Sequence, residues 1–435
     1  MARALILVVL VLSLGLGAGC SGEGTGPVRF LVFGDPEELA AYRALVDAYG
    51  MKEPDADVQL VEASDRTDLI ARLSTSIAGG SPPDLFLMNY RFYGQFAAKG
   101  AIEPMEERLR STDAFAGSDF YPQALQAFQW RDEQLCLPQN VSSLVVYYNR
   151  GLFRRFRVPE PRAGWTWTEL VAKAGLLTRD AGGRVALGGD PDAGAVRPAI
   201  YGLGVEPTLI RVAPFVWSNG GELVDDERRP TRLTLDTPEA RQALQSFLDL
   251  RAQGVVPTDE DVEAEDDESR FANGRLGMLL SSRRSTTTFR TIDDLDWDVA
   301  PLPRHREPAG ILHSDAYCMT AASKRKDAAW RFVEFALGPD GQRVVARTGR
   351  TVPSLISVSR SRAFLDPSQP PLRARVFLDA IPNIRQVPSI STWPEIEDAT
   401  GGVLENGLYL GQHVNQVIRE LDRVTRPLFA RGESP

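Results

Sequence analysis

The sequence contains 435 residues, of which 43% are hydrophobic and 25% are charged. These proportions are typical of a globular protein, and the length allows about two to three domains. The formal net charge of −9 argues against nucleic acid and against an anionic surface as partners. The three cysteines and three histidines show no spacing typical of a zinc site, and no metal or cofactor is expected.

The chain begins with an apolar segment, from Ala4 to Leu16, behind one basic residue. At about 13 residues this segment is too short to span a bilayer as a mature helix, which indicates a signal peptide over residues 1–19. Residues 16–20, LGAGC, resemble a bacterial lipobox, in which the thiol is acylated and the cysteine becomes the first mature residue. Cys20 is therefore the predicted lipidation site, and residues 20–27 are the predicted flexible stalk. An ordinary cleavage site with a spectator cysteine is the alternative.

Two further cysteines remain, Cys136 and Cys318. They could pair in an oxidising compartment, but a single bridge is not a disulfide framework. The sequence therefore favours two buried free thiols over a bond between them.

The residues after the stalk alternate between strand and helix patterns. VRFLVFGD (28–35) predicts a strand, residues 37–49 an amphipathic helix, and DVQLVEA (57–63) a second strand. A helix from Asp65 follows, and PDLFLMN (83–89) predicts a buried third strand. This β-α-β-α-β order predicts a largely parallel sheet, which places ligands beyond the carboxyl ends of its strands. The first and third strands end at residues 33–35 and 88–90.

The same alternation returns in the middle of the chain. SSLVVYYN (142–149), AIYGLGV (199–205), FANGRLGMLLSS (271–282) and WDVAPLP (297–303) predict strands. Residues 166–178 and 238–253 predict helices, the second with Pro238 at its start and Gly254 past its end. The acidic run over residues 259–269 is interpreted as a solvated loop or helix start.

Seven stretches together resemble the bacterial extracellular solute-binding proteins of carbohydrate ABC transporters, the class related to maltose-binding protein. They occur in the family's order and cover the chain from about Val28 to the end. They are LIARLSTSIAGGSPPDLFLMN, LPQNVSSLVVYYNRGLF, WTWTELVAKAGLLT, FVWSNGGELVDDERRPTRLTLDTPEARQALQSFLDL, FANGRLGMLL, WDVAPLP and AAWRFVEFALGPDGQRVVARTGRTVPS. Each is weak alone, and seven in register are specific.

The resemblance implies an α/β fold of two lobes, the periplasmic-binding-protein fold of type II, with a mostly parallel sheet and flanking helices in each lobe. The amino-terminal lobe would comprise residues 28–138 and 310–352, and the carboxy-terminal lobe residues 139–309 and 353–435. Three crossovers would join them at LPQN, HREPAG and TVPS, where prolines interrupt regular structure. Helices over residues 393–408 and 412–429 would pack on the second lobe.

A sugar offers hydroxyls, which need hydrogen-bond donors and acceptors, and a weakly apolar ring face that stacks on aromatic side chains. Strand ends and crossovers supply both kinds of residue. The predicted ligand-binding residues are Asp35, Glu37, Asn89, Tyr90, Tyr93, Asn140, Trp217, Ser281, Arg283, Arg284, His313, Asp315, Arg385 and Trp393.

Some of these residues have a structural alternative. Helix capping accounts for Asp35 as well as ligand binding does, and it is favoured for Glu37. Trp217 could stack on a ring or lie in the core. Relatives often carry an aromatic residue where this chain has Arg283 and Arg284, and since neighbouring strand residues face opposite ways, one of the two should face the cleft. A guanidinium there would suit an acidic or unusually polar ligand.

The resulting functional hypothesis is a monomeric, lipid-anchored capture protein on the outer side of a membrane. It would close on a carbohydrate-like solute by hinge bending and deliver the solute to an ABC permease. The alternatives are a secreted carbohydrate-active enzyme and a ligand sensor that presents to a signalling receptor. For the enzyme, Glu395 and Glu397 are the available carboxylates, but as neighbours on a helix start they point apart.

Overall fold

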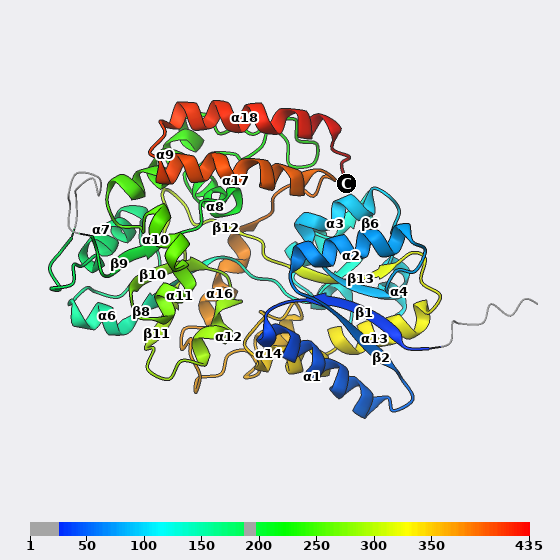
Figure 1. The fold of residues 1–435 in the computed structure, drawn as a ribbon. Coiled ribbons are helices and arrows are strands. Elements are labelled where there is room, and N and C mark those ends of the chain that lie inside the picture. Colours follow the sequence, from blue (N-terminus) through cyan, green and yellow to red (C-terminus); the bar gives the residue numbers. More distant parts are fainter. Residues whose placement is uncertain (1–25, 187–196) are drawn as a thin grey trace, which may run out of the picture.

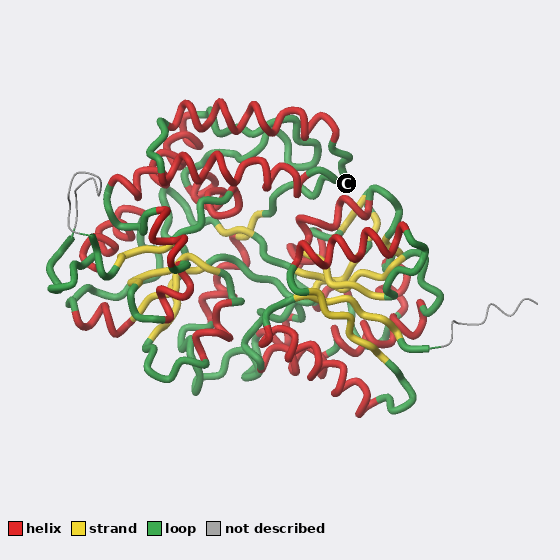
Figure 2. Tube along the Cα trace, viewed as in Figure 1, coloured by secondary structure: helices red, strands yellow, loops and turns green. Residues whose placement is uncertain are grey.

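The computed structural model describes residues 26–186 and 197–435. The predicted signal peptide and Cys20 lie outside the described residues. Figure 2 shows two separate groups of strands, each surrounded by helices, with loops passing between them. This is the predicted two-lobe α/β architecture. Within the described ranges, no helix is both long and apolar enough to span a membrane.

The first sheet brings together strands from both ends of the first lobe. Its order is β2 (Val58–Ala63), β1 (Val28–Phe33), β3 (Leu85–Asn89), β13 (Asp315–Thr320) and β4 (Ile102–Glu103), and β7 (Cys136–Pro138) also pairs with β13. Strands β2, β1 and β3 are parallel, so their carboxyl ends share one edge. Strand β13 is antiparallel to β3, β4 and β7, because the chain enters it at that same edge when it returns from the second lobe.

The second sheet is smaller. Its order is β11 (Trp297–Ala300), β8 (Val145–Asn149), β10 (Leu276–Ser281) and β9 (Tyr201–Gly204). Strands β9 and β10 are parallel, whereas β8 is antiparallel to both β10 and β11. The sheets are therefore mixed, and the parallel pairing that the sequence predicted covers only part of each.

Helices flank both sheets (Figure 1). Those of the first lobe are α1 (Pro36–Lys52), α2 (Arg66–Ala78), α3 (Tyr90–Ala97), α4 (Glu106–Ser111), α5 (Pro122–Gln126), α13 (Lys326–Leu337) and α14 (Pro339–Arg347). The remaining helices in the described ranges are α6 (Arg150–Arg155), α7 (Trp167–Leu177), α8 (Leu209–Ser218), α9 (Pro238–Ala252), α10 (Asp259–Ala264), α11 (Asp267–Ala272), α12 (Ser285–Arg290), α15 (Ile356–Ser359), α16 (Arg375–Ala380), α17 (Trp393–Tyr409) and α18 (Val414–Arg431). The acidic run thus forms α10 and α11, which begin at the capping residues Thr258 and Asp266.

Three segments between the sheets hydrogen-bond to one another. The chain leaves the first sheet after β7 and returns between β11 and β13. Ser142 and His313 exchange backbone hydrogen bonds of 2.9 and 2.8 Å, and the Val141 amide donates to the Val352 carbonyl at 3.0 Å. Val352 lies in TVPS, whereas Val141 and Ser142 lie just after LPQN and His313 lies after HREPAG. The positions of the predicted crossovers and lobe boundaries therefore stay a prediction.

Helices α17 and α18 lie along the top of the view in Figure 1 and pack on α8 and α9. The start of α17 also reaches the first lobe, where it contacts α3. Arg91 on α3 forms an ion pair with Glu397 on α17, and a Cβ atom added at Gly94 would lie 2.2 Å from the Ser389 carbonyl oxygen. The C-terminal segment therefore bridges the two lobes.

The expectation of two free thiols is wrong, because Cys136 and Cys318 form a disulfide. They are directly opposed on the antiparallel strands β7 and β13, with a Cα–Cα distance of 4.6 Å. The sequence separation of 182 residues concealed this pairing, which only the return of β13 to the first sheet creates. The bond joins the strand that leaves the first lobe to the strand that re-enters it.

Removing this disulfide should destabilise the protein. We expect the Cys136→Ala/Cys318→Ala double variant to lose about 2–5 kcal/mol of unfolding free energy, as is usual when a native disulfide is lost. Urea denaturation with and without a thiol reductant measures the effect. The parent should be sensitive to the reductant and the double variant insensitive, and equal midpoints for all four samples would contradict the prediction.

Candidate functional site

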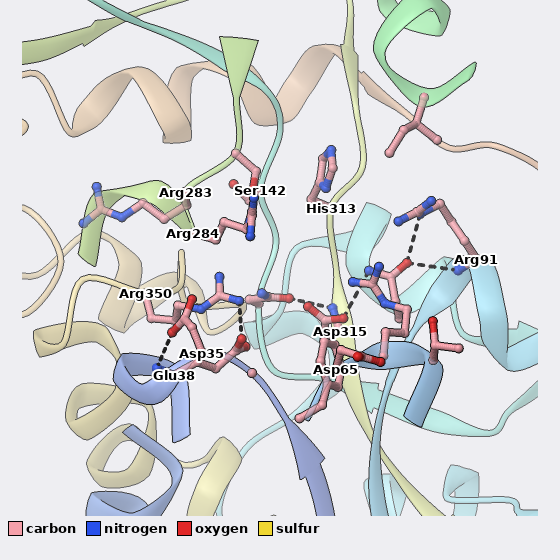
Figure 3. A pocket seen from close by; sticks show the side chains of 18 of the residues that line it. Asp35, Glu38, Asp65, Arg91, Ser142, Arg283, Arg284, His313, Asp315 and Arg350 are labelled. Carbon is pink, nitrogen blue, oxygen red and sulfur yellow. Dashed lines mark hydrogen bonds and ion pairs between the residues drawn. The ribbon is translucent and has the colours of Figure 1, made fainter. Parts of the chain in front are cut away.

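A cavity of about 470 Å³ lies between the lobes (Figure 3). It is bounded by the carboxyl ends of β1, β2 and β3, the start of β13, the crossovers, and the facing loops of the second lobe. Its lining residues are Phe33, Gly34, Asp35, Glu38, Ser64, Asp65, Arg66, Thr67, Asn89, Arg91, Asn140, Ser142, Glu206, Ile210, Arg211, Ser282, Arg283, Arg284, His313, Asp315 and Arg350. The walls are mostly polar or charged.

The first-lobe wall is built from helix caps. Asp35 and Asp65 follow parallel strands and Asn89 ends one, and each accepts a backbone hydrogen bond from the first turn of α1, α2 or α3. A cap must lie at the strand-to-helix turn, and this turn is also the edge that faces the second lobe. Capping and cavity lining are therefore compatible, and Asp35 does both.

The crossovers form the floor of the cavity through a chain of hydrogen bonds. The Asp315 amide donates to Asn140 Oδ1 at 2.7 Å, and Asn89 Nδ2 donates to Asp315 Oδ1 at 3.1 Å. Ser314 Oγ donates to the Asn140 carbonyl at 2.7 Å. These bonds hold the first crossover, β13 and the end of β3 together, so the polar atoms of the floor are fixed in position.

A buried ion pair joins α1 to the third crossover. The Glu38 carboxylate pairs with the Arg350 guanidinium, and the Tyr42 hydroxyl lies 3.4 Å from Glu38 Oε1. Burial raises the pKa of Glu38, and the neighbouring Arg350 opposes this shift. Because the Glu38 and Arg350 side chains are only 5% and 14% exposed, each depends on the other for charge compensation.

Two arginines of the first lobe line the cavity in different states. Arg91 already has partners within the protein, because its Nη1 pairs with Glu397 and its Nε donates to Asn89 Oδ1. Arg66 packs against the rings of Phe33 and Phe92, each 5.1 Å from the guanidinium carbon. Among the described residues the Arg66 side chain has no hydrogen bond and no ion pair, and its Nε is buried without a partner.

The second-lobe wall carries arginines with acidic neighbours. Arg211, 6% exposed, binds Glu206 through Nε and Nη2 at 3.0 and 2.7 Å, and its Nη1 is buried without a partner. The charge of Arg211 lowers the pKa of Glu206. Arg284 pairs with Glu268 at 3.0 Å and is 47% exposed.

Arg283 and Arg284 point in different directions, but strand alternation is not the reason, because β10 ends at Ser281 and both residues lie in the turn before α12. The Arg283 side chain extends away from the other labelled residues in Figure 3, with its guanidinium between Phe364 and Phe377 and its Nε on the Gly349 carbonyl. Burial in this apolar setting lowers its pKa to about 9. Arg284 is therefore the one of the pair whose guanidinium stays at the cleft, where Glu268 pairs with it.

His313 lies at the centre of the site, on the second of the hydrogen-bonded crossovers. Burial lowers its pKa well below the usual value, and the charges of Arg211, Arg91, Arg66 and Arg284 lower it further. Its Nε2 is buried without a partner among the described residues. The imidazole is therefore neutral at physiological pH.

The structure brings half of the predicted site residues together. The cavity lining includes Asp35, Asn89, Asn140, Arg283, Arg284, His313 and Asp315. It does not include Glu37, Tyr90, Tyr93, Trp217, Ser281, Arg385 and Trp393. Glu37 is exposed, while its neighbour Glu38 lines the cavity.

The residues outside the lining have structural partners. Tyr93 donates to the Gln129 carbonyl, Trp393 Nε1 donates to Glu397, and Ser281 Oγ bonds to Ser285 Oγ. Arg385 pairs with Glu222 and Glu227 and lies 4.9 Å above the buried ring of Trp217. Tyr90 accepts a hydrogen bond from the Val387 amide. The expected aromatic platform is thus absent from the described lining, in which Phe33 is the aromatic residue.

The sequence reading missed Ser64, Asp65, Arg66 and Thr67, which follow β2. The rule applied to the ends of β1 and β3 would have found them, because β2 is parallel to β1 and ends at the same edge. Arg91 and Glu206 carry the same signal, since each lies two residues past the end of β3 or β9. Arg211, on α8, and Arg350 carry no comparable local signal. Among the described residues no cluster of acidic, histidine and cysteine side chains could hold a metal ion.

Comparison with known proteins gives a family match over residues 34–343, to the bacterial extracellular solute-binding proteins. A maltotriose-binding protein of Pyrococcus abyssi is 24% identical over 324 residues, covering 73% of this chain and 64% of that protein. A Listeria monocytogenes ABC substrate-binding protein, solved with cycloalternan, superposes with a TM-score of 0.81 at 23% identity, covering 92% and 98% of the two chains. UgpB from Mycobacterium tuberculosis, solved with glycerophosphocholine, superposes with a TM-score of 0.78 at 20% identity, covering 94% of this chain and 99% of that chain. These structural likenesses show the fold.

The neutral state of His313 predicts a pH dependence of stability. Its folded pKa lies below the unfolded value of about 6.5, so the unfolded chain binds a proton that the folded chain does not. The contribution of the neutral His313 imidazole to the unfolding free energy is complete above about pH 6.5. Below that pH it decreases by up to about 1.4 kcal/mol per pH unit, the value for one proton. We expect His313→Gln to flatten the fall in unfolding free energy between about pH 6.5 and 5, measured by urea denaturation. An unchanged slope would contradict this.

The Glu38–Arg350 pair predicts an asymmetric double-mutant cycle. Arg350→Met should cost about 3–5 kcal/mol of unfolding free energy, because it leaves Glu38 buried without its partner. The Glu38→Gln/Arg350→Met double variant should lose less than the single variant, since no carboxylate remains to be compensated. Denaturant unfolding of the two single variants, the double variant and the parent measures the coupling, and additive losses would disprove it.

Proposed function

The chain belongs to the bacterial extracellular solute-binding protein family, and on this premise we propose that it captures a sugar or sugar-like solute between its lobes. One observation carries this proposal: a polar cavity of about 470 Å³ that is lined by both lobes and by the crossovers between them. A volume of this size is in the range of small-molecule sites.

The cavity chemistry suits hydroxyl groups. Asp35, Asp65 and Asp315 form no ion pair within the described chain, so their carboxylates are available to accept hydroxyl protons. Asn89 and Asn140 are already engaged with Asp315, which fixes the geometry of the acceptors. Preorganised acceptors of this kind favour a polyhydroxylated solute, because less ordering is required on binding.

The relatives support the same class of solute. The Pyrococcus protein is named for maltotriose, the Listeria protein was solved with the oligosaccharide cycloalternan, and UgpB was solved with glycerophosphocholine. Oligosaccharides, monosaccharides and polyol phosphates are therefore the classes proposed for this chain.

Capture would proceed by hinge closure. Only a closed arrangement lets one solute contact both the first-lobe caps and the second-lobe arginines, so the solute would shift an open-closed equilibrium toward the closed state. The hinge would be the three hydrogen-bonded crossovers. The closed, loaded form would be the one that the transmembrane subunits of an ABC permease recognise.

The remaining parts of the proposal concern location and state. The protein would act as a monomer outside the cytoplasm, held to a membrane by acylated Cys20 after removal of residues 1–19. The Cys136–Cys318 disulfide supports export, since such bonds persist in oxidising compartments.

The proposal includes no catalysis. Glu395 and Glu397, the carboxylates that an enzyme hypothesis would use, do not line the cavity. Glu395 pairs with Arg431 on the surface, and Glu397 is occupied by Arg91 and by Trp393 Nε1. Neither is placed to act on a solute in the cleft.

Native mass spectrometry of the freshly purified protein, followed by calorimetric titration with the identified solute, tests this function. We expect a bound small molecule of unchanged mass, a single-site heat of association, and a higher melting temperature in the presence of that solute. Conversion of the solute to products of different mass would favour the enzyme. A protein that carries no solute and binds no carbohydrate, polyol or polyol phosphate in a broad panel would contradict the proposal.

A further inference from the structure

We propose that the cleft selects solutes that bear an oxyanion, a carboxylate or a phosphate, and that this group binds between Arg66 of the first lobe and Arg211 of the second. This inference rests on the proposed capture function and specifies the chemical class of its solute. Both arginines line the same cavity, and they come from opposite walls.

Arg66 is the most available cation of the site. It follows the cap Asp65 at the start of α2, and contacts with Phe33 and Phe92 hold its guanidinium in place. Because its side chain has no hydrogen bond or ion pair in the described chain, a ligand can bind the guanidinium without breaking an existing polar contact. A guanidinium held between aromatic rings and left without an acid partner suits an oxyanion.

Arg211 supplies the second donor. Its side chain is 6% exposed and therefore anchored in the second-lobe wall, whereas its partner Glu206 is 53% exposed. Of the two, the acid is the one that can turn toward solvent when an anion arrives. Nη1 of Arg211 also has no partner in the described chain, so the arginine retains donor capacity while Glu206 is bound.

The other cations of the site strengthen the positive potential without being free to bind. Arg91 is held by Glu397 and Arg284 by Glu268. Together with Arg66 and Arg211 they surround His313, and all four lower its pKa. Of these four arginines, Arg66 is the one that pairs with no carboxylate in the described chain, so its positive charge is the least compensated.

The carboxylates are spread along the cavity, from Asp35 and Glu38 beside Arg350 to Asp65 and Asp315 in the direction of Arg91 (Figure 3). Asp315 and Asp35 both add to the raised pKa of Glu38, which places their negative charge beside it. Asp315 also acts on Arg66, because its charge opposes the lowering of the Arg66 pKa. The lining therefore combines acceptors for hydroxyls with donors for an anion at Arg66 and Arg211. With Phe33 as the aromatic residue of the described lining, charge and hydrogen bonds must supply the selectivity. Sugar acids and sugar or polyol phosphates match this pattern.

The test uses matched probes that differ only in the acidic group: glucose, glucuronate and glucose 6-phosphate, together with glycerol and glycerol 3-phosphate. Calorimetry with the full chain should show that acidic members bind at least about tenfold more tightly than their neutral partners, as one charge-assisted hydrogen-bonded contact would give. This preference should shrink as salt is raised. Comparing glucuronate with the phosphates distinguishes a carboxylate from a phosphate site.

Variants locate the effect. Arg66→Gln and Arg211→Gln should each reduce affinity for the acidic probe about tenfold or more and leave binding of the neutral partner within about twofold. Arg229→Gln, at an exposed arginine outside the cavity lining, is the matched control and should bind both as the parent does. Circular dichroism and melting temperature establish that each variant is folded.

The outcomes separate the two proposals. The oxyanion inference would be overturned if neutral probes bound as tightly as acidic ones, or if the variants lost affinity for the neutral and the acidic probe equally. The proposal of solute capture would still hold in either case. If a variant does not fold, calorimetric titration of the parent with inorganic phosphate at constant ionic strength decides the question, because a specific site gives a saturable single-site heat, whereas the general stabilising effect of phosphate does not saturate. No binding by any probe, and no effect of phosphate, would count against both proposals.

Discussion

Strand β13 is the constraint on which the cleft depends. It enters the first sheet from the second lobe and pairs with β3, β4 and β7, so the first lobe cannot be completed until the chain has traversed much of the second. The same strand carries Cys318, which is bonded to Cys136 on β7, and begins at Asp315, which is hydrogen-bonded to Asn89 and Asn140. Sheet pairing, covalent bond and cavity floor are thus properties of one strand.

The architecture also explains why the cavity is polar. Parallel strands that lead into helices need capping side chains at the turn. Such side chains are polar, because they must accept hydrogen bonds from the free backbone N–H groups of the first helical turn. Asp35, Asp65 and Asn89 therefore bring acceptors to the sheet edge as a condition of forming α1, α2 and α3. The second lobe adds arginines, and the interior between the lobes becomes a site where charge and hydrogen bonds act in a partly enclosed space.

Much of this could be predicted from the sequence, and the failures have definite physical reasons. Strand-end logic located Asp35 and Asn89, because a strand followed by a helix has a local signature, whereas the crossovers were implied by the family resemblance. It could not separate Tyr90 and Trp217 from the site, since a buried aromatic residue in an apolar segment has the same local pattern whether it packs in a core or faces a ligand. Pairing across 182 residues, as in the disulfide, leaves no local signal at all.

The distance between the lobes tests the account most directly. Spin labels at Met51→Cys on α1 and Leu176→Cys on α7, positions 79% and 47% exposed on different lobes, report it by electron-electron double resonance. The account predicts that saturating solute shifts the distance distribution to shorter values, because one molecule must contact both walls of the cavity. An unchanged distribution with the solute demonstrably bound would show that the cleft does not close on its ligand.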